Sequence, residues 1–209
     1  MQGILVTLEG IDGCGKSTQG RLLAEGLAAS GARVVHTFEP GGTPWGEGVR
    51  ALFLRGEERL SPVTELFLMA ADRREHVDRV IQPALAEGAV VVCERYVDST
   101  VAYQGFGRSL PLEWIFHANE LATGGLLPSL TLWLDLPLHE ARRRRSDRTD
   151  RLEAEEARFH ERVRDGYRWL WEEHPERVAR IDATGSPEEV YARIAQKLRD
   201  SGILTGGSR

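Results

Sequence analysis

One octapeptide near the start of the sequence combines the residue types that bind a nucleoside triphosphate. Residues 10–17 read GIDGCGKS and match the pattern G-x-x-x-x-G-K-[ST]. Glycines let successive backbone N–H groups point at phosphate oxygens, Lys16 reaches the β- and γ-phosphates, and the Ser17 hydroxyl can bind Mg²⁺. The pattern therefore predicts an ATP-binding loop made of Gly10, Ile11, Asp12, Gly13, Cys14, Gly15, Lys16, Ser17 and Thr18.

The segments around this loop alternate in the way typical of an α/β protein. Short apolar runs rich in β-branched residues predict strands, covered on both faces, at 4–9, 33–38, 89–94, 130–135 and 178–182. Amphipathic segments between them predict helices at about 17–30, 62–87, 111–123, 137–146, 152–174 and 187–200. This alternation predicts right-handed crossovers and a doubly wound, parallel, five-stranded sheet flanked by helices, of the P-loop NTPase type.

Serine and proline mark several of the predicted helix starts. Ser61 can cap the helix that begins at Pro62, and Pro111, Pro137 and Pro187 stand at other helix entries. In a doubly wound sheet, ligands bind at the carboxyl ends of the strands. Because the motifs that could carry chemistry all follow predicted strands, we expect them to meet at one edge of the sheet.

Composition narrows the class of protein. The sequence has 209 residues, of which 28% are charged and 41% apolar, and a net charge of -5, which is ordinary for one globular domain and unsuited to binding nucleic acid or anionic membranes. Two cysteines suit a reducing compartment, and neither a signal-peptide pattern nor an apolar run of roughly 20 residues occurs. We expect a single domain over 1–209, located in the cytoplasm, with a flexible tail at 202–209 and no nucleic-acid or membrane partner.

The phosphate loop alone does not separate a kinase from a GTPase switch or an ATPase motor. A GTPase should carry the guanine-reading sequence N-K-x-D, but Lys16 and Lys197 are the only lysines and neither lies in such a sequence. A motor usually needs a hydrophobic strand that ends in Asp or Asp-Glu, together with a longer chain. Here the third predicted strand ends in CERY at 93–96, and an arginine-rich stretch at 142–148 follows the fourth. Positioned cations of this kind favour phosphoryl transfer.

Several spaced motifs together resemble the thymidylate kinase family over nearly the whole chain. EGIDG at 9–13 opens the loop in the family manner, and EPGGTP at 39–44, followed by Gly46, Glu47 and Arg50, is similar to the family's E-P-G-G-T-P segment. AADR at 70–73 with His76 resembles its A-A-D-R…H helix, and ERYVDSTVAYQG at 94–105 resembles its D-R-Y…S…A-Y-Q-G signature. The pattern continues downstream in DRLE at 150–153, Phe159, RVR at 162–164, GY at 166–167 and IDA at 181–183.

The resemblance implies a homodimeric enzyme that transfers the γ-phosphoryl group of ATP to dTMP, giving dTDP and ADP, with Mg²⁺ bound. Because the acceptor is an ionised phosphate, the reaction needs no serine–histidine pair or carboxylate base, and the sequence offers no such constellation. By resemblance, Lys16 grips the donor and Arg95 holds the acceptor phosphate. Glu94 is implied to help organise Mg²⁺ through water, together with Ser17.

By resemblance, a second set of residues binds the acceptor nucleotide. Arg73 and Gln104 would read the thymine edge, and Tyr103 would occupy the place of a ribose 2′-hydroxyl and so favour deoxyribose. On residue type alone, however, a surface helix position is favoured for Arg73, and a core aromatic fits Tyr103 equally well. The remaining implied positions are Asp12 at the sugar hydroxyl, Thr100 beside the base, Arg50 over the pocket, Glu39 and Met69.

The arginine-rich segment at about 142–151 is predicted to form a short lid. The variable positions of the phosphate loop, residues 11–14, include no arginine, so a second cation for the transition state must come from elsewhere. By resemblance the lid supplies it, and Arg143, Arg148 and Arg151 are equal candidates for a catalytic role. The alternative is a solvated basic helix end, which the helix dipole favours.

Three residues depart from the usual family pattern. Glu94 replaces the commoner aspartate, Met69 replaces a phenylalanine that stacks on the base, and Phe38 replaces an arginine that is common before Glu39.

The rival enzyme is a kinase for dUMP, dCMP or a deoxynucleoside, because one methyl group is worth only about 1–3 kcal/mol in a pocket. The rival from another class is a nucleotide-binding switch that hydrolyses slowly. The six histidines show no metal-ligand spacing and are assigned no chemistry, and Trp114 with Phe116 would suit a dimer contact.

Overall fold

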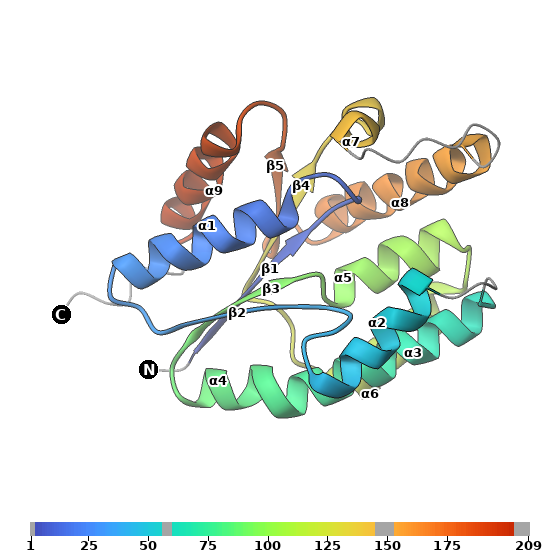
Figure 1. Ribbon diagram of the computed structural model, residues 1–209, viewed down its shortest axis with the longest axis horizontal. Coiled ribbons are helices and arrows are strands. Elements are labelled where there is room, and N and C mark those ends of the chain that lie inside the picture. The colour runs from blue at the N-terminus through green and yellow to red at the C-terminus, as the bar shows by residue number, and fades with distance from the viewer. Residues whose placement is uncertain (1–2, 56–59, 145–152, 203–209) are drawn as a thin grey trace.

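Five parallel strands form the centre of the protein, for which a computed structural model describes residues 3–55, 60–144 and 153–202. The strands lie in the order β2-β3-β1-β4-β5 (Figure 1). Their bounds are Ile4–Glu9 (β1), Val34–Phe38 (β2), Val90–Glu94 (β3), Leu130–Asp135 (β4) and Val178–Asp182 (β5). After β1 the chain builds β2 and β3 on one side and then crosses to β4 and β5 on the other, so the predicted doubly wound parallel sheet is confirmed.

Helices cover both faces of this sheet (Figure 1). On one face α1 packs on β2, β3 and β1, and α9 on β5; on the other, α4 lies against β3, and α8 contacts β4 and β5. The helices are α1 (Lys16–Ala29), α2 (Pro44–Arg55), α3 (Pro62–His76), α4 (Gln82–Ala86), α5 (Val97–Thr100), α6 (Leu112–Thr123), α7 (Leu138–Arg144), α8 (Glu153–Glu173) and α9 (Pro187–Ser201), with π-helical segments η1 (Val77–Ile81) and η2 (Val101–Gly107).

The three central strands, β3, β1 and β4, are buried on both faces, which explains their continuous apolar sequences. Val6, Leu8, Val92, Leu132 and Leu134 are fully buried, and each lies in one of the three central strands. Burying a side chain of this size contributes about 1.5–3 kcal/mol to folding. The core therefore fixes the strands whose carboxyl ends carry the chemical groups.

Capping residues at the starts of α3 and α9 explain why the sequence predicted where these helices begin. The Ser61 hydroxyl accepts a hydrogen bond from the Thr64 N–H at 3.2 Å, with Pro62 following it, as predicted. At the start of α9, Ser186 and Glu189 exchange side-chain and backbone hydrogen bonds, which makes a capping box. Each cap satisfies N–H groups that the helix itself leaves without partners.

Two helical regions were missed by the sequence patterns. The α2 helix begins at Pro44 and contains Gly46 and Gly48, which lower its intrinsic helix propensity. The α5 and η2 segments together form a helix at 97–107 that follows β3, and much of it has π-helical hydrogen bonding. A π-helical segment does not follow the period of 3.6 residues, so periodicity is a poor guide to it.

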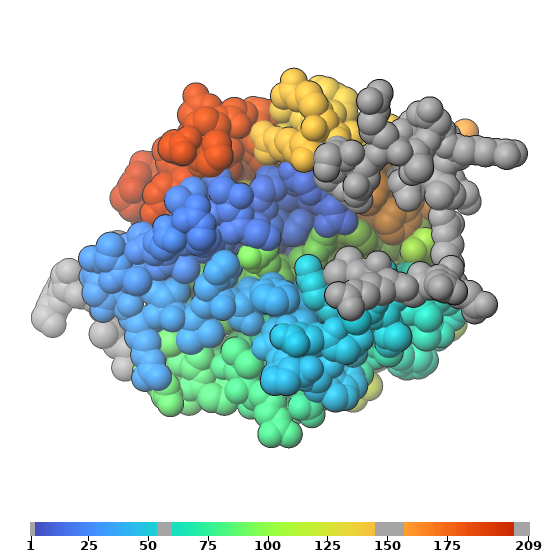
Figure 2. All heavy atoms as spheres, in the orientation of Figure 1, coloured from blue at the N-terminus to red at the C-terminus, as the bar shows by residue number. Residues whose placement is uncertain are grey.

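None of the helices in the described ranges is long and apolar enough to cross a membrane. Most of the predicted lid, including Arg148 and Arg151, lies outside the described residues, as does 203–209 of the predicted tail. The surface seen in Figure 2 is hollowed between the blue residues of the N-terminal part and the cyan residues of α2. This hollow lies at the carboxyl edge of the sheet.

Candidate active site

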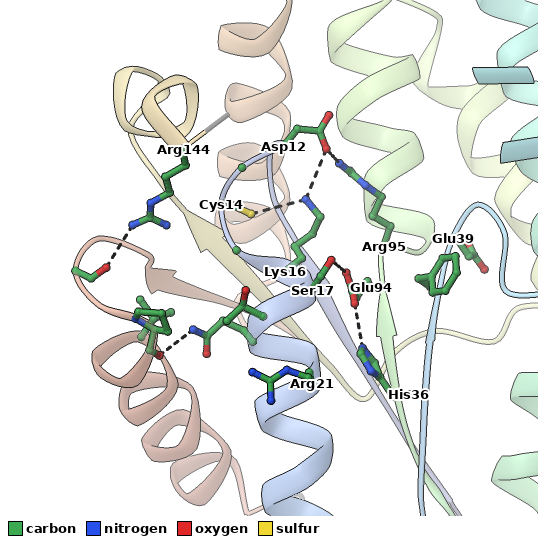
Figure 3. A pocket seen from close by; sticks show the side chains of 18 of the residues that line it. Asp12, Cys14, Lys16, Ser17, Arg21, His36, Glu39, Glu94, Arg95 and Arg144 are labelled. Carbon is green, nitrogen blue, oxygen red and sulfur yellow. Dashed lines mark hydrogen bonds and ion pairs between the residues drawn. The ribbon is translucent and has the colours of Figure 1, made fainter. Parts of the chain in front are cut away.

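Two adjoining cavities open at the carboxyl ends of the strands. The larger has a volume of about 900 Å³ and is lined by the loop after β1, the end of β3 and the start of α9 (Figure 3). The smaller has a volume of about 330 Å³ and lies among α3, η2 and α8. Asp12, Glu39, Arg50 and Arg95 line both cavities. Two ligands could therefore meet at these residues.

The loop after β1 has the shape of a phosphate-binding loop. Gly10, Gly13 and Gly15 all have positive φ angles, and a Cβ at Gly10 would lie 2.7 Å from the Leu134 carbonyl oxygen. The Lys16 ammonium donates hydrogen bonds to the carbonyl oxygens of Gly10 and Ile11, both at 3.0 Å, and so spans the loop (Figure 3). Because α1 begins at Lys16, its first N–H groups and the positive end of its dipole face the larger cavity.

Lys16 is the charged group at the centre of this loop. Burial and the nearby Arg95 guanidinium lower the pKa of the Lys16 ammonium, while the Asp12 carboxylate, 4.0 Å away, opposes this shift. An anionic ligand in the cavity would stabilise the ammonium further. The predicted loop residues 10–18 are thus brought together as expected.

A chain of hydrogen bonds joins α1, β3 and β2 at the floor of the larger cavity (Figure 3). The Ser17 hydroxyl donates to Glu94 Oε2 at 2.6 Å, and His36 Nε2 lies 3.0 Å from Glu94 Oε1. Burial raises the pKa of Glu94, but the hydrogen bonds from His36 and Ser17 outweigh it and leave the pKa below the usual value. Gly20 makes room for this chain, since a Cβ there would lie 2.6 Å from His36 Nε2.

Arg95 projects between the two cavities from a strained position. Its backbone has a φ of 66°, in the left-handed region that non-glycine residues rarely adopt. Its guanidinium donates to Asp12 Oδ1 at 2.6 Å, to the Tyr103 hydroxyl at 3.0 Å and to Ser99 Oγ at 3.2 Å. The guanidinium also lies 4.6 Å from the centre of the Tyr103 ring. These contacts hold a cation at the point where the cavities meet.

The turn that carries Arg95 is fixed by the last residue of β1. The buried Glu9 carboxylate accepts hydrogen bonds from the Tyr96 N–H at 2.7 Å and the Ser99 N–H at 3.2 Å. It also accepts bonds from the Ser99 hydroxyl at 2.6 Å and the Tyr167 hydroxyl at 2.8 Å. Glu9 therefore satisfies the first N–H groups of α5 from a neighbouring strand. The sequence motif included Glu9 but assigned it no role.

Arg73 forms part of the wall of the smaller cavity, and the surface interpretation of this residue is wrong. Only 2% of it is exposed. Its Nε donates to Glu39 at 2.8 Å, Nη1 to Thr100 at 2.8 Å and to Asn119 at 2.7 Å, and Nη2 to the Tyr96 carbonyl at 3.0 Å. Such a network holds the guanidinium in one orientation.

All of the other predicted acceptor residues also line the smaller cavity: Asp12, Glu39, Arg50, Met69, Arg95, Thr100, Tyr103 and Gln104. The Tyr103 ring packs edge-on against Phe159 and Tyr167, as a core aromatic would, and its hydroxyl accepts a hydrogen bond from Arg95. The role at the sugar stays a prediction. The Arg50 guanidinium lies 5.2 Å from the Phe38 ring, so the departure at Phe38 gives Arg50 an aromatic contact.

Of the lid candidates, only Arg143 lies in the described ranges. It is exposed, at the end of α7, and lines neither of the two cavities. The next residue, Arg144, lines the larger cavity and donates to the carbonyl oxygens of Ala183 at 3.1 Å and Gly185 at 3.4 Å (Figure 3). Arg144 was not singled out from the sequence.

Two histidines, to which the sequence interpretation assigned no chemistry, hold acidic residues of the site. His36 contacts Glu94 as described above, and His76 Nδ1 lies 2.9 Å from Glu39 Oε1. His76 Nε2 in turn lies 2.7 Å from the Thr37 hydroxyl. Neither pairing follows from sequence spacing, because Glu94 is 58 residues from His36 and Glu39 is 37 residues from His76.

The sheet order, the phosphate loop and the adjoining second cavity define a P-loop nucleotide kinase. The sequence profile described as thymidylate kinase matches residues 8–194. The chain belongs to the thymidylate kinase family, and it is a phosphotransferase.

Named relatives support the assignment along the chain. A thymidylate kinase of Synechococcus sp. (strain JA-3-3Ab) is 56% identical over 191 residues, which cover 91% of this chain and 93% of the relative. A thymidylate kinase of Thermosynechococcus vestitus (strain NIES-2133 / IAM M-273 / BP-1) is 46% identical, covering 94% and 87% respectively. The crystal structure of thymidylate kinase from Ehrlichia chaffeensis matches with a TM-score of 0.81 and 32% identity, over 95% of this chain and 100% of that one.

Proposed function

We propose that this protein transfers the γ-phosphoryl group of ATP to dTMP, giving ADP and dTDP for the synthesis of dTTP. The observation that carries the proposal is the position of Arg95, which lines both cavities and lies beside the phosphate loop. ATP would occupy the larger cavity and dTMP the smaller, with their phosphates meeting at this guanidinium. The names of the relatives support the choice of acceptor.

The donor phosphates would be bound by groups that are already in place. The N–H groups of residues 10–18 and the Lys16 ammonium would replace the hydration of the β- and γ-phosphates. Since Lys16 is held by two loop carbonyls, little reorganisation is needed for it to meet the anion. Gly10, Ile11, Asp12, Gly13, Cys14, Gly15, Ser17 and Thr18 complete the proposed ATP site.

The acceptor phosphate would bind through Arg95 and needs no general base, because its oxygens are already ionised. The planar guanidinium can donate two parallel hydrogen bonds to a phosphate group. In the structure Arg95 donates to the Asp12 carboxylate, which occupies part of the place that the acceptor phosphate would take. Around the nucleoside we assign Arg73, Gln104 and Thr100 to the base, Tyr103 and Asp12 to the sugar, and Glu39, Arg50 and Met69 to the pocket walls.

The donor set suits Mg²⁺ as the metal cofactor. Ser17 Oγ and Glu94 Oε2 are hard oxygen ligands, 2.6 Å apart, at the floor of the larger cavity. When bound, Mg²⁺ would neutralise charge on the β- and γ-phosphate oxygens. We assign Ser17 as its direct ligand and Glu94 as a ligand through water. The longer arm of Glu94, compared with the commoner aspartate, is directed to this place by His36 and Ser17.

Activity measurements test the proposed reaction. Purified protein with ATP and Mg²⁺ should form ADP with dTMP as acceptor, and more slowly with dUMP, dCMP or thymidine. Arg95→Ala should lower kcat/KM for dTMP by about 10²-fold or more while ATP binding is retained, because charge-assisted hydrogen bonds contribute about 1.5–3 kcal/mol each. Arg168→Ala, which removes an exposed arginine outside both cavities, is the matched control.

Each rival function has its own result in these assays. Faster turnover of dCMP or thymidine than of dTMP would overturn the choice of acceptor. A slow hydrolysis of ATP that is indifferent to Arg95→Ala would instead favour a nucleotide-binding switch. No ADP formation with any pyrimidine deoxynucleotide would contradict a kinase altogether.

The lid role remains part of the proposal. Arg143, Arg148 and Arg151 are its candidate arginines, and the short lid would span about 142–151. Replacing each in turn with alanine should lower kcat much more than ATP affinity in at least one variant, since an arginine supplied in this way can contribute roughly 10³–10⁵-fold to turnover. Full turnover in all three variants would refute a catalytic lid. Arg144→Ala belongs in the same series because Arg144 lines the ATP cavity.

A homodimer is the proposed assembly. Large apolar side chains are exposed on the adjacent helices α3 and α6, including Phe67 (66% exposed), Trp114 (51%), Phe116 (45%) and Leu121 (79%). A second copy of the chain would remove them from water. Light scattering after size exclusion should give the mass of a dimer, and Leu121→Glu should give that of a monomer. A monomeric wild-type protein would contradict the proposal.

We propose further that residues 1–209 act as a single domain in the cytoplasm. Cys14 and Cys93 are both free and buried, which suits a compartment where thiols stay reduced. One cooperative unfolding transition and recovery of the enzyme in the cytoplasmic fraction are the expected results. Two separate transitions, or recovery in another fraction, would contradict these two assignments.

A further inference from the structure

A buried glutamate forms part of the wall of the smaller cavity, in the first turn of α3. Glu65 is 7% exposed and is held by Arg108, which follows η2. Arg108 Nε donates to Glu65 Oε2 at 3.0 Å and Nη2 donates to Oε1 at 2.9 Å. This two-point contact fixes the plane of the carboxylate. The Arg108 guanidinium is itself seated 4.6 Å from the centre of the Phe159 ring.

The fixed carboxylate determines which way the Gln104 amide points. Gln104 Nε2 donates to Glu65 Oε2 at 3.3 Å. An ionised carboxylate offers only acceptors, so the amide nitrogen, and never the amide oxygen, must face Glu65. Gln104 Oε1 therefore points away from Glu65. Because Gln104 lines the smaller cavity, this oxygen is the group that it offers to a ligand there. No donor to this oxygen is found within the described part of the chain.

Arg73 supplies the opposite type of group on the same wall. A guanidinium carries five N–H groups, and four of those on Arg73 are donated to Glu39, Thr100, Asn119 and the Tyr96 carbonyl. The remaining N–H is on Nη2. Because Arg73 lines the cavity, the wall presents one fixed acceptor from Gln104 and one fixed donor from Arg73.

We propose that Glu65 determines the base specificity of this cavity, by holding Gln104 so that only a pyrimidine with a protonated N3 and a carbonyl at C4 is matched. Thymine and uracil have both features. Cytosine reverses both, with an acceptor at N3 and an amino group at C4. The inference rests on the proposed function, in that the smaller cavity is taken as the nucleotide acceptor site. In this proposal Glu65 acts through Gln104 and is a positioning residue.

The comparison of dUMP with dCMP isolates this edge, because the two nucleotides differ only at N3 and C4 of the base. A site built to hydrogen-bond a substrate can reject a mismatched analogue by roughly 10⁴-fold, since its buried polar groups lose their partners. We therefore expect the wild-type protein to prefer dUMP over dCMP in kcat/KM by at least about 10²-fold. Equal turnover of the two nucleotides would overturn the inference.

The variant Glu65→Leu tests how the amide is held. Leucine has a similar volume but no acceptor, so the hydrogen bond from Gln104 Nε2 to this position is lost. Gln104 is then free to turn and present its own nitrogen to the cavity. The ratio of kcat/KM for dUMP to that for dCMP is expected to fall by at least about tenfold, the effect of one net hydrogen bond. The KM for ATP should not change, because Glu65 does not line the ATP cavity.

Three further variants separate positioning from general damage. Glu120→Leu removes an exposed carboxylate from α6 and should leave the ratio unchanged. Gln104→Ala should lower the ratio as Glu65→Leu does. In the Gln104→Ala background, Glu65→Leu should have no additional effect on the ratio, because its influence passes through that amide. Additive effects of the two substitutions would overturn the inference.

The outcomes distinguish this inference from the function on which it rests. If the wild-type protein phosphorylates dTMP but Glu65→Leu keeps the full preference for dUMP over dCMP, only the role of Glu65 is overturned. If the wild-type protein phosphorylates no pyrimidine deoxynucleotide, both are overturned. If Glu65→Leu does not fold, as judged by loss of ATP binding, the wild-type ratio and that of Gln104→Ala still decide: an unchanged ratio in Gln104→Ala refutes the mechanism.

Discussion

Replacing the buried Glu9 with glutamine should make the protein progressively more stable, relative to wild type, as the pH rises. Burial, and next the charge of Asp98, raise the pKa of Glu9 from 4.5 to about 7, although hydrogen bonds from Ser99 and Tyr167 and the charge of Arg95 oppose the shift. The folded protein therefore keeps a proton on this carboxyl over a pH range in which the unfolded chain has lost it. Glutamine carries no such proton.

The sign and size of the effect follow from this difference in bound protons. Between pH 4.5 and about 7 the folded state holds more protons than the unfolded state, so the free energy of unfolding falls by about 1.4 kcal/mol for each pH unit gained. The stability linked to this group is present below pH 4.5 and is lost by about pH 7. From pH 5.5 to 8.5 the change amounts to about 2 kcal/mol in wild type and is absent in Glu9→Gln.

Urea unfolding of both proteins at pH 5.5, 6.5, 7.5 and 8.5 would measure this effect. The difference in unfolding free energy, variant minus wild type, should rise by about 2 kcal/mol across the series and level off near pH 7.5. Asp72, whose pKa burial raises to about 6, acts equally in both proteins and cancels from the difference. A difference that is flat with pH, or that falls, would refute the reasoning, because Glu9 would then be ionised in the fold throughout.

Two further substitutions test other buried contacts. Arg73→Met should lower the free energy of unfolding by about 3–5 kcal/mol, since it leaves the buried Glu39 carboxylate without its cation, whereas Arg74→Met, at the exposed next position, should cost less than about 1 kcal/mol in the same urea titration. His36→Ala should weaken Mn²⁺ binding to the ATP-loaded protein about tenfold, as read by electron paramagnetic resonance, because Glu94 loses one of the two groups that orient it. An unchanged Mn²⁺ affinity would mean that Ser17 alone directs Glu94.

The parts of the site that sequence could predict are those built by neighbouring residues. The phosphate loop is a run of consecutive residues between a strand and a helix, and Arg95 directly follows a buried strand. Short-range spacing carries this information. The same holds for the central strands, whose apolar runs reflect burial on both faces, and for Ser61, which caps its own helix.

The parts that sequence could not predict depend on contacts between distant segments. Glu65 and Gln104 are 39 residues apart, and Glu9 and Tyr167 are 158 residues apart. Neither distance leaves a periodic signal in the sequence. Arg73 was open to a surface interpretation because its burial depends on α6 packing over α3, as its bond to Asn119 shows.

The lid prediction shows that two neighbouring arginines of one helix can face different surroundings. Consecutive residues of a helix point about 100° apart, so a run of arginines on α7 contains members that face different surroundings. Arg143 was chosen from this run, but among its described members Arg144 is the one that lines the larger cavity. Composition identifies such a cluster, but the rotation of the helix decides which member meets the ligand.

The four residues shared by the two cavities also have a consequence for inhibitor design. Asp12, Glu39, Arg50 and Arg95 line both compartments, so the two adjoin along these residues. A single molecule with a nucleoside at each end and a chain of phosphates between them could then occupy both at once. Once one end is bound, the other is confined near its own compartment at an effective concentration in the millimolar range or above for a short tether, so weak affinities for the separate halves would combine into tight binding.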